Sequence, residues 1–188
     1  RIVDAMGGVI GAESEVGVGS TFRVRLSLRI DEDAGSDAVA APFHDIRALV
    51  VDDIDVNRLI LSEQLAAWGM SAVCVENAEA ALETARKAAV KGAPFEIAIL
   101  DYQMPGMNGA DLARAMRADK RLAVMPLILL TSAGRKGDPK GLEGDLFDAY
   151  LVKPARASML LDAIASSLRN KSVEQLALAA ARAPAARA

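Results

Sequence analysis

Between about residues 46 and 169, short apolar runs alternate with longer stretches of helical period. The apolar runs, which predict strands, lie at residues 46–51, 72–75, 95–100, 127–130 and 149–152. The first, third and fourth runs are apolar almost throughout, as expected of parallel strands that are covered on both faces. Apolar stripes three and four residues apart separate the runs and predict helices. The pattern therefore predicts five β-α units and a doubly wound α/β fold.

Single residues mark the ends of several predicted helices. Asn77 and Asn108 are suited to N-caps, because their side-chain oxygens can accept hydrogen bonds from first-turn amides. Asp55 is predicted to cap the first helix in the same way. Gly69 and Gly92 are suited to helix ends, because glycine adopts the left-handed conformation at low cost.

Three stretches depart from this alternation. Residues 29–45 are acidic and rich in small residues, and they are predicted to be a linker. Residues 134–146 hold four glycines and a proline, so the fourth helix of the domain is predicted to be short or mobile. Residues 170–188 form an Ala- and Arg-rich tail or linker, which could begin as a helix over residues 173–181.

Polar residues follow the predicted strands at one edge of the sheet, where ligands of open α/β folds bind. The first strand ends in Asp52 and Asp53, the third in Asp101, the fourth in Thr131 and the fifth in Lys153. Crowded carboxylates with few other ligands fit Mg²⁺. Asp101 can then act as a nucleophile toward a phosphoryl group. The metal and Lys153 would neutralise charge on that group, and Thr131 could hydrogen-bond it.

Residues 46–169 resemble a receiver domain of two-component signalling. Four segments carry the resemblance, in the same order and spacing: Val51-Asp52-Asp53, Asp101 with Met104-Pro105-Gly106-Met107-Asn108-Gly109, Leu130-Thr131-Ser132-Ala133, and Tyr150-Leu151-Val152-Lys153-Pro154. The resemblance implies a flavodoxin-like, five-stranded parallel sheet in the order 2-1-3-4-5, with a cis peptide bond before Pro154. Ile54 departs from the family pattern, in which Asn is frequent at this position.

The resemblance also implies a metal site. Asp53, Asp101 and the backbone carbonyl of Gln103 would bind Mg²⁺, and Asp52 would help through metal-bound water. These four residues form the expected metal site, and Mg²⁺ is the expected cofactor.

The same resemblance implies a phosphoacceptor and a switch. Asp101 would receive the phosphoryl group from a kinase histidine, Lys153 would pair with it, and Thr131 would move toward it. Tyr150 would then change its burial and reshape the face made by the fourth helix, the fifth strand and the fifth helix. Asp101, Lys153 and Thr131 are thus the expected catalytic residues, and Thr131 and Tyr150 the expected switch.

Residues 1–28 are similar to the closing segment of a histidine kinase ATPase domain. This segment would comprise a helix end at Ala5-Met6, a strand at residues 10–13, a tight turn, and a final strand at residues 21–28 that completes a β-hairpin. The boxes that hold ATP would lie upstream, so this piece lacks a complete kinase catalytic domain. A kinase end followed by a receiver describes a hybrid histidine kinase, whose receiver catalyses its own phosphorylation.

Composition limits the partners. A formal net charge of −3, with 25% charged residues, argues against a non-specific nucleic-acid binder. No apolar run reaches the roughly 18 residues that cross a bilayer, so this piece is not expected to contact a membrane. The expected location is the cytoplasm, or the cytoplasmic portion if the parent is membrane-bound. The expected partner is the dimerisation and phosphotransfer domain of a histidine kinase, in the same or a separate protein, and homodimers are compatible with the sequence. His44, in the linker, is not predicted to be a phosphodonor.

Two other functions remain open from the sequence. The domain could be a pseudo-receiver, which docks partners without transferring phosphate. It could also be a haloacid-dehalogenase-like phosphatase, because Asp53-Ile54-Asp55-Val56 after an apolar strand resembles the first motif of those enzymes. Thr131 and Lys153 would then be the later motifs. Asp101 would have no role in such a phosphatase, which argues against it.

Overall fold

The computed structural model describes residues 2–27, 43–132 and 146–182, with side chains described through Lys171. The chain divides into two compact units, residues 1–40 and residues 41–188. Each unit is described by itself.

The smaller unit holds one short helix and a β-hairpin. Helix α1 (Ile2–Ala5) is followed by strands β1 (Val9–Glu15) and β2 (Gly19–Arg25), which pair in antiparallel fashion. The turn between the strands places Gly17 at φ 83°, a conformation that glycine adopts at low steric cost. The strands extend further toward the turn than the sequence predicts, and β2 ends earlier, at Arg25.

The hairpin has one apolar and one charged face. Ile10 lies opposite Val24, and Ala12 lies opposite Phe22, so these four side chains share a face. The other face carries the ion pair between Arg23 and Glu13, at 2.5 Å. Ile10, Phe22 and Val24 are each half or more exposed, and Ala12 is exposed as well, within the part of the chain that the structure describes.

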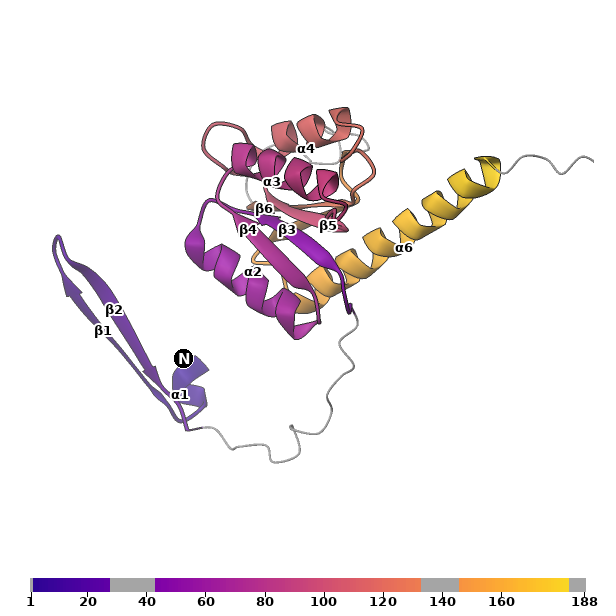
Figure 1. Cartoon of the computed structure of the whole chain (residues 1–188). Coiled ribbons are helices and arrows are strands. Elements are labelled where there is room, and N and C mark those ends of the chain that lie inside the picture. The colour runs from indigo at the N-terminus through magenta and orange to yellow at the C-terminus, as the bar shows by residue number, and fades with distance from the viewer. Residues whose placement is uncertain (1, 28–42, 133–145, 183–188) are drawn as a thin grey trace, which may run out of the picture. The chain divides into compact units, whose positions relative to one another are not determined.

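The larger unit is a five-stranded parallel sheet with helices on both faces (Figure 1). Its elements are β3 (Arg47–Val51), α2 (Asp55–Ala67), β4 (Ser71–Val75), α3 (Ala78–Val90), β5 (Ile97–Asp101), α4 (Gly109–Ala118), β6 (Leu127–Ser132), β7 (Ala149–Lys153) and α6 (Ala157–Arg182). The strands lie in the order β4-β3-β5-β6-β7, and every neighbouring pair is parallel. The predicted doubly wound fold and its strand order 2-1-3-4-5 are therefore confirmed.

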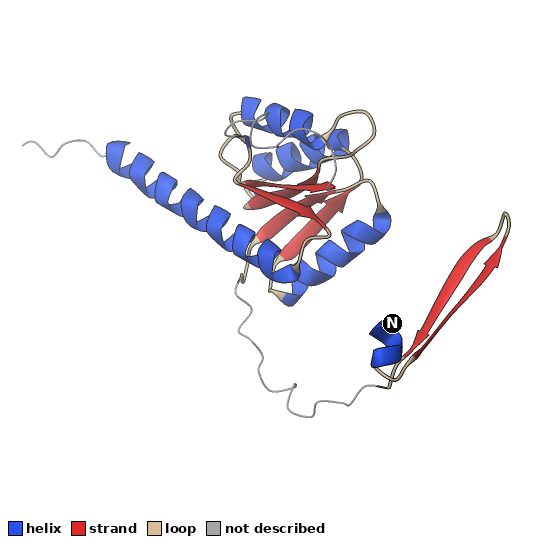
Figure 2. Cartoon of the chain, turned by 180° about the vertical axis from the view of Figure 1, so that it is seen from behind, coloured by secondary structure: helices blue, strands red, loops and turns tan. Residues whose placement is uncertain are grey.

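Alternating side chains of each strand serve two hydrophobic cores. Leu49 and Val51 of β3 pack with buried residues of α3 and α4, whereas Ala48 and Val50 pack with those of α2 and α6. Figure 2 shows the sheet between these helix layers from behind. Because both faces are covered, the central strands need apolar residues at every position, which explains their uninterrupted apolar runs.

The predicted asparagine caps and glycine helix ends are confirmed. The side chain of Asn77 accepts a hydrogen bond from the amide of Ala80 at 2.8 Å. Asn108 accepts from two amides in the first turn of α4, both at 2.9 Å. Gly69 and Gly92 follow α2 and α3 with φ of 86° and 72°, so glycine is the residue that these turns favour.

The predicted cap at Asp55 is wrong. Ile54 occupies the N-cap position of α2 and provides no side-chain hydrogen bond. Asp55 is the first helical residue, and its carboxylate pairs with Arg58 one turn later. The carboxylate of Asp52, at the strand end, accepts a hydrogen bond from the amide of Ile54, the residue that precedes the helix.

The end of the chain also differs from the prediction. Helix α6 continues from Ala157 to Arg182, past the predicted domain end at residue 169, with no break before the stretch 173–181. The predicted weak fourth helix, residues 134–146, lies almost wholly outside the described residues, as does most of the predicted linker. The peptide bond between Lys153 and Pro154 is cis, as the resemblance implies. Within the described ranges, the helices are too short or too polar to span a bilayer.

Candidate functional site

Three carboxylates meet at the carboxyl edge of the sheet. Asp52 and Asp53 directly follow β3, and Asp101 is the last residue of β5, the strand that pairs with β3 in parallel. One carboxylate oxygen from each of the three lies within 4.8 Å of the others. Asp52 is 0% and Asp101 4% exposed, whereas Asp53 is open to solvent. The group is therefore anchored in the fold on one side and accessible on the other.

Lys153 joins this group from β7. Its Nζ lies 2.7 Å from Oδ2 of Asp52 and 2.9 Å from Oδ1 of Asp101. Three carboxylates and one ammonium leave an excess of two negative charges when all are ionised. An excess of this kind in a partly buried site attracts a cation.

Burial and pairing act against each other on these groups. Burial raises the pKa of Asp101 above its ordinary value, although the hydrogen bond and charge of Lys153 act in the opposite direction. Burial alone would lower the pKa of Lys153, but its contacts with Asp52 and Asp101 outweigh that effect and raise the pKa. Lys153 is thus held as an ammonium at neutral pH.

Two residues of the first turn of α2 complete the surroundings of Asp52. Asn57 donates from Nδ2 to both carboxylate oxygens of Asp52, at 3.0 and 3.1 Å. Arg58 donates to the backbone carbonyl of Asp52 at 2.5 Å. The sequence analysis missed both residues. Their only signal is their place in the first turn of a helix that follows a strand, which lets their side chains reach back to the strand end.

Two further predicted site residues are Gln103 and Thr131. The amide of Gln103 hydrogen-bonds the carboxylate of Asp101. Thr131 lies on β6, one residue beyond Leu130, the register partner of Asp101, and is partly buried. Both residues are therefore at the same edge of the sheet as the acids.

Tyr150 lies apart from the acids, deeper along β7. Its ring packs edge-to-face on Phe147 at a centroid distance of 5.3 Å. It borders the core that lies under α3 and α4, and its hydroxyl oxygen is buried.

The loop between β5 and α4 brings backbone very close to Asp101. Gly109 begins α4 and donates its amide hydrogen to the carbonyl of Tyr102 at 3.1 Å. A Cβ at Gly109 would overlap with the backbone carbonyl oxygen of Asp101. Glycine is required here because two backbones are in contact. A hollow of about 390 Å³ lies beside this loop, lined by Asp53, Tyr102, Gln103, Met104, Pro105 and Asn108.

The donor set at this edge fits a hard divalent cation. Carboxylate oxygens from Asp52, Asp53 and Asp101 converge, and Asp53 faces the open hollow where water ligands have room. Mg²⁺ takes oxygen ligands and keeps several waters. It therefore fits an open site in which a few protein oxygens lie on one side and water occupies the other.

Comparisons with known proteins identify the larger unit. Residues 48–165 match the model of the response regulator receiver domain. The chain is 39% identical over 127 residues to the virulence sensor protein BvgS of Bordetella bronchiseptica, which covers 63% of this chain and 10% of that protein. It is 31% identical over 119 residues to the chemotaxis protein CheY of Pseudomonas aeruginosa, covering 63% of this chain and 93% of that protein.

A longer match involves both units. The chain is 28% identical over 195 residues to the sensory/regulatory protein RpfC of Xanthomonas campestris, covering 87% of this chain and 26% of that protein. A match over that share of the chain extends past residues 41–188 into residues 1–40. The chain spans about a quarter or less of the length of these two sensor proteins.

Solved structures agree with the sequence matches. The receiver protein from Pseudomonas putida is 29% identical with a TM-score of 0.54, and the match covers 63% of this chain and 94% of that one. The chemotaxis protein CheY4 of Vibrio cholerae is 27% identical with a TM-score of 0.57, covering 65% and 98%. Receiver domains bind Mg²⁺ in an acidic pocket such as the one described above. The chain therefore belongs to the response regulator receiver family of two-component signalling.

Proposed function

We propose that Asp101 accepts a phosphoryl group from a phosphohistidine of a sensor histidine kinase. The observation that carries this proposal is the position of the Asp101 carboxylate. It is buried, held 2.9 Å from the ammonium of Lys153, and placed within 4.8 Å of an oxygen from each of two further acids. A carboxylate fixed in this way is oriented for attack on an incoming phosphorus atom.

In the transfer step, a carboxylate oxygen of Asp101 attacks phosphorus and forms a new P–O bond. The P–N bond to the donor histidine breaks, its electron pair returns to the imidazole ring, and the product is an aspartyl phosphate. Lys153 keeps its positive charge beside the acceptor and stabilises negative charge on the phosphoryl oxygens. Thr131, at the end of the neighbouring strand, supplies a hydroxyl that can hydrogen-bond a phosphoryl oxygen.

Mg²⁺ is the proposed cofactor. Asp53, Asp101 and the backbone carbonyl of Gln103 would hold it directly, and Asp52 would act through a metal-bound water. The support is the convergence of the three carboxylates and the open hollow beside Asp53. When bound, Mg²⁺ would neutralise charge on the phosphoryl oxygens during transfer.

Thr131 and Tyr150 form the proposed switch. Thr131 is on β6 near the acceptor, and Tyr150 is on β7, paired in register with Leu129 of β6. Movement of Thr131 toward a phosphoryl group would change the space beside β7, and Tyr150 would change its burial. Among the described residues, the surface that would respond comprises β7 and α6; the fourth helix, the remaining part of the predicted output face, lies outside them.

The proposed partner is the helical dimerisation and phosphotransfer domain of a histidine kinase. Helix α2 and the residue before it expose Ile54, Val56, Leu59 and Ile60, each half or more exposed, next to the acid site. A groove of about 380 Å³ lies between α2 and the loop after β7, and it is lined by Leu61, Pro154 and Leu160 among others. An apolar helix face of this kind fits a helical partner. The partner would lie in the cytoplasm, in the same chain or another, and pairing of two receivers is a further proposal.

The smaller unit is proposed to be the end of a histidine kinase ATPase domain, which would make the parent a hybrid histidine kinase. The longer match to a sensory/regulatory protein supports this, as does the name of another relative, the sensor histidine kinase AruS of Pseudomonas aeruginosa, 34% identical over 117 residues. The exposed apolar face of the hairpin also fits a strand pair that is covered in a larger domain. The proposed division is residues 1–28, linker 29–45, receiver 46–169 and tail 170–188.

Acetyl phosphate tests the phosphoacceptor role directly. Incubation of the chain with Mg²⁺ and acetyl phosphate should add the mass of one phosphoryl group, and Asp101→Asn should abolish the addition. The control is Asp111→Asn, an exposed aspartate of α4 that should leave labelling unchanged. Wild-type labelling of Asp101→Asn would refute the proposal, and an unlabelled wild type that also fails to bind beryllofluoride would favour a pseudo-receiver.

The phosphatase alternative receives no support from the comparisons. It predicts hydrolysis of small phosphate esters that Asp53→Asn eliminates and Asp101→Asn preserves. The phosphoacceptor proposal predicts no such hydrolysis by the wild type.

A further inference from the structure

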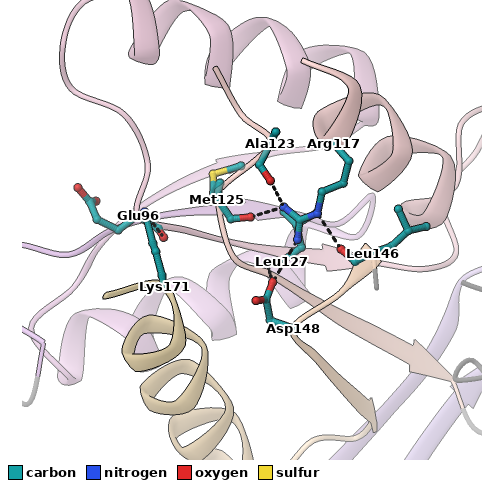
Figure 3. A network of polar contacts seen from close by, with 8 residues as sticks. All are labelled: Glu96, Arg117, Ala123, Met125, Leu127, Leu146, Asp148 and Lys171. Carbon is teal, nitrogen blue, oxygen red and sulfur yellow. Dashed lines mark hydrogen bonds and ion pairs between the residues drawn. The ribbon is translucent and has the colours of Figure 1, made fainter. Parts of the chain in front are cut away.

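Arg117 connects three segments at the amino edge of the sheet, opposite the acid site. It lies in the last turn of α4, and its guanidinium donates to four acceptors (Figure 3). These are the carbonyls of Ala123 at 2.9 Å, Met125 at 2.6 Å and Leu146 at 3.1 Å, and Oδ2 of Asp148 at 3.1 Å. A planar guanidinium can satisfy such a divergent set of acceptors, whereas a lysine ammonium cannot.

Asp148 is held from a second direction. Its Oδ2 also accepts the amide hydrogen of Leu127 at 2.8 Å, and its own amide donates to the carbonyl of Leu127 at 2.9 Å. The residues on either side of Phe147 are therefore both fixed, Leu146 by Arg117 and by packing on the core, and Asp148 by Arg117 together with the start of β6.

Phe147 lies between these two fixed residues and packs against Tyr150. Its side chain is 7% exposed and belongs to the core under α3 and α4. Its ring contacts Tyr150 edge-to-face at 5.3 Å, and the ring planes are inclined by 64°. Because a ring in a close-packed core has few alternative positions, the place of Phe147 limits the positions that Tyr150 can adopt.

We propose that Arg117 is a positioning residue for Tyr150: by holding residues 146 and 148, it sets the position of Phe147 and thereby the burial of the switch tyrosine. This proposal rests on the proposed function, which assigns Tyr150 its role as a switch. It makes the equilibrium between the unphosphorylated and phosphorylated conformations depend on a contact on the far edge of the sheet from Asp101. By linkage, Arg117 then also affects how tightly the acid site binds a phosphoryl mimic.

Fluorine NMR of fluorotyrosine-labelled protein tests the proposal. The chain has only two tyrosines, so Tyr102→Phe assigns both signals. In Arg117→Lys, the Tyr150 signal should move toward its position in the urea-unfolded protein, while the Tyr102 signal stays in place. The apparent dissociation constant for beryllofluoride with Mg²⁺ should change by about 2- to 30-fold. The matched control is Arg114→Lys in the same helix, which should move neither, because Arg114 makes an exposed pair with Asp111.

A second variant tests the route through Phe147. Phe147→Leu keeps the contacts of Arg117 but removes the ring, and it should move the Tyr150 signal in the same direction. An unmoved Tyr150 signal in Arg117→Lys, even with a lower unfolding midpoint, would show that Arg117 only stabilises the fold and would overturn the proposal. An unmoved signal in Phe147→Leu would overturn it too. Absence of wild-type labelling by acetyl phosphate, with Tyr150 shifted in both variants, would refute the phosphoacceptor role and leave the positioning by Arg117 intact.

Discussion

The two edges of the sheet differ in how their charged side chains are balanced. At the carboxyl edge, Asp52, Asp53 and Asp101 share one ammonium, and burial raises the pKa of Asp101. At the amino edge, the guanidinium of Arg117 meets four acceptors. The carboxyl edge thus has excess negative charge that a bound cation can neutralise. At the amino edge, the charge of Arg117 is neutralised by acceptors of the protein itself. Substitutions at the two edges should therefore change stability in opposite directions.

Arg117→Met should give the largest loss of stability. The substitution keeps most of the apolar stem but removes the donor of three carbonyls and one of the hydrogen bonds that Asp148 accepts. The free energy of unfolding should therefore fall by about 2–4 kcal/mol. Urea unfolding followed by circular dichroism measures it. Arg114→Met, at an exposed pair in the same helix, should change it by less than about 0.5 kcal/mol. Equal losses for the two variants would erase the contrast between the edges.

Mg²⁺ should stabilise the carboxyl edge specifically. At a concentration 100 times its dissociation constant, a ligand of the folded state adds about 2.7 kcal/mol to the free energy of unfolding. Thermal unfolding with and without Mg²⁺ measures this, and Asp53→Asn should reduce the shift strongly. Asp55→Asn is the matched control, because Asp55 is a nearby exposed acid that pairs with Arg58 instead. An equal shift in all three proteins would mean that the ion binds elsewhere.

Asp101→Asn should stabilise the protein in the absence of Mg²⁺, by about 1 kcal/mol at neutral pH. The folded-state pKa of Asp101 is raised, so its ionised form is less favoured in the folded than in the unfolded protein. That destabilisation is present above the folded-state pKa and disappears as the pH falls through it. The advantage of the variant in urea unfolding should therefore shrink in acid. A variant less stable than the wild type at pH 7 would contradict this account.

The smallest effect is expected at Asp119, which caps the turn after α4. Arg86 and Arg121 lower the pKa of its carboxyl to about 2. A lowered folded-state pKa contributes stability above the ordinary value of 3.8, and this stability is lost as the pH falls toward about 2. Asp119→Asn should therefore weaken the dependence of the unfolding midpoint on pH in that window. An unchanged pH profile would show that the two arginines do not stabilise the ionised form.

The sequence predicted the fold well because the signals are local and repeated. Uninterrupted apolar runs identify buried parallel strands, and Asn77 and Gly69 mark helix ends through their own side-chain and backbone chemistry. The predicted cap at Asp55 failed by one residue, because α2 begins at Asp55 itself, which places its carboxylate in the first turn beside Arg58. Likewise, the long helix α6 could not be distinguished from a separate tail by composition alone.

The site was predictable to the extent that strand ends converge. Parallel strands bring Asp52, Asp101 and Lys153 to one edge, so their proximity follows from topology. The contacts of Asn57 with Asp52 depend on how the first helical turn faces the strand, and those of Arg117 depend on loops meeting at the other edge. Contacts between segments of irregular backbone have no period in sequence, which is why these residues were not found there.

The contact between Gly109 and the backbone of Asp101 has a consequence for how the domain can move. With no side-chain atoms between them, the start of α4 and the end of β5 cannot approach further, and any side chain at residue 109 would push them apart. Displacement of the Asp101 peptide toward α4 would thus be passed directly to that helix, whose other end carries Arg117. Helix α4 would then couple the position of Asp101 to that of Arg117 at the opposite edge of the sheet.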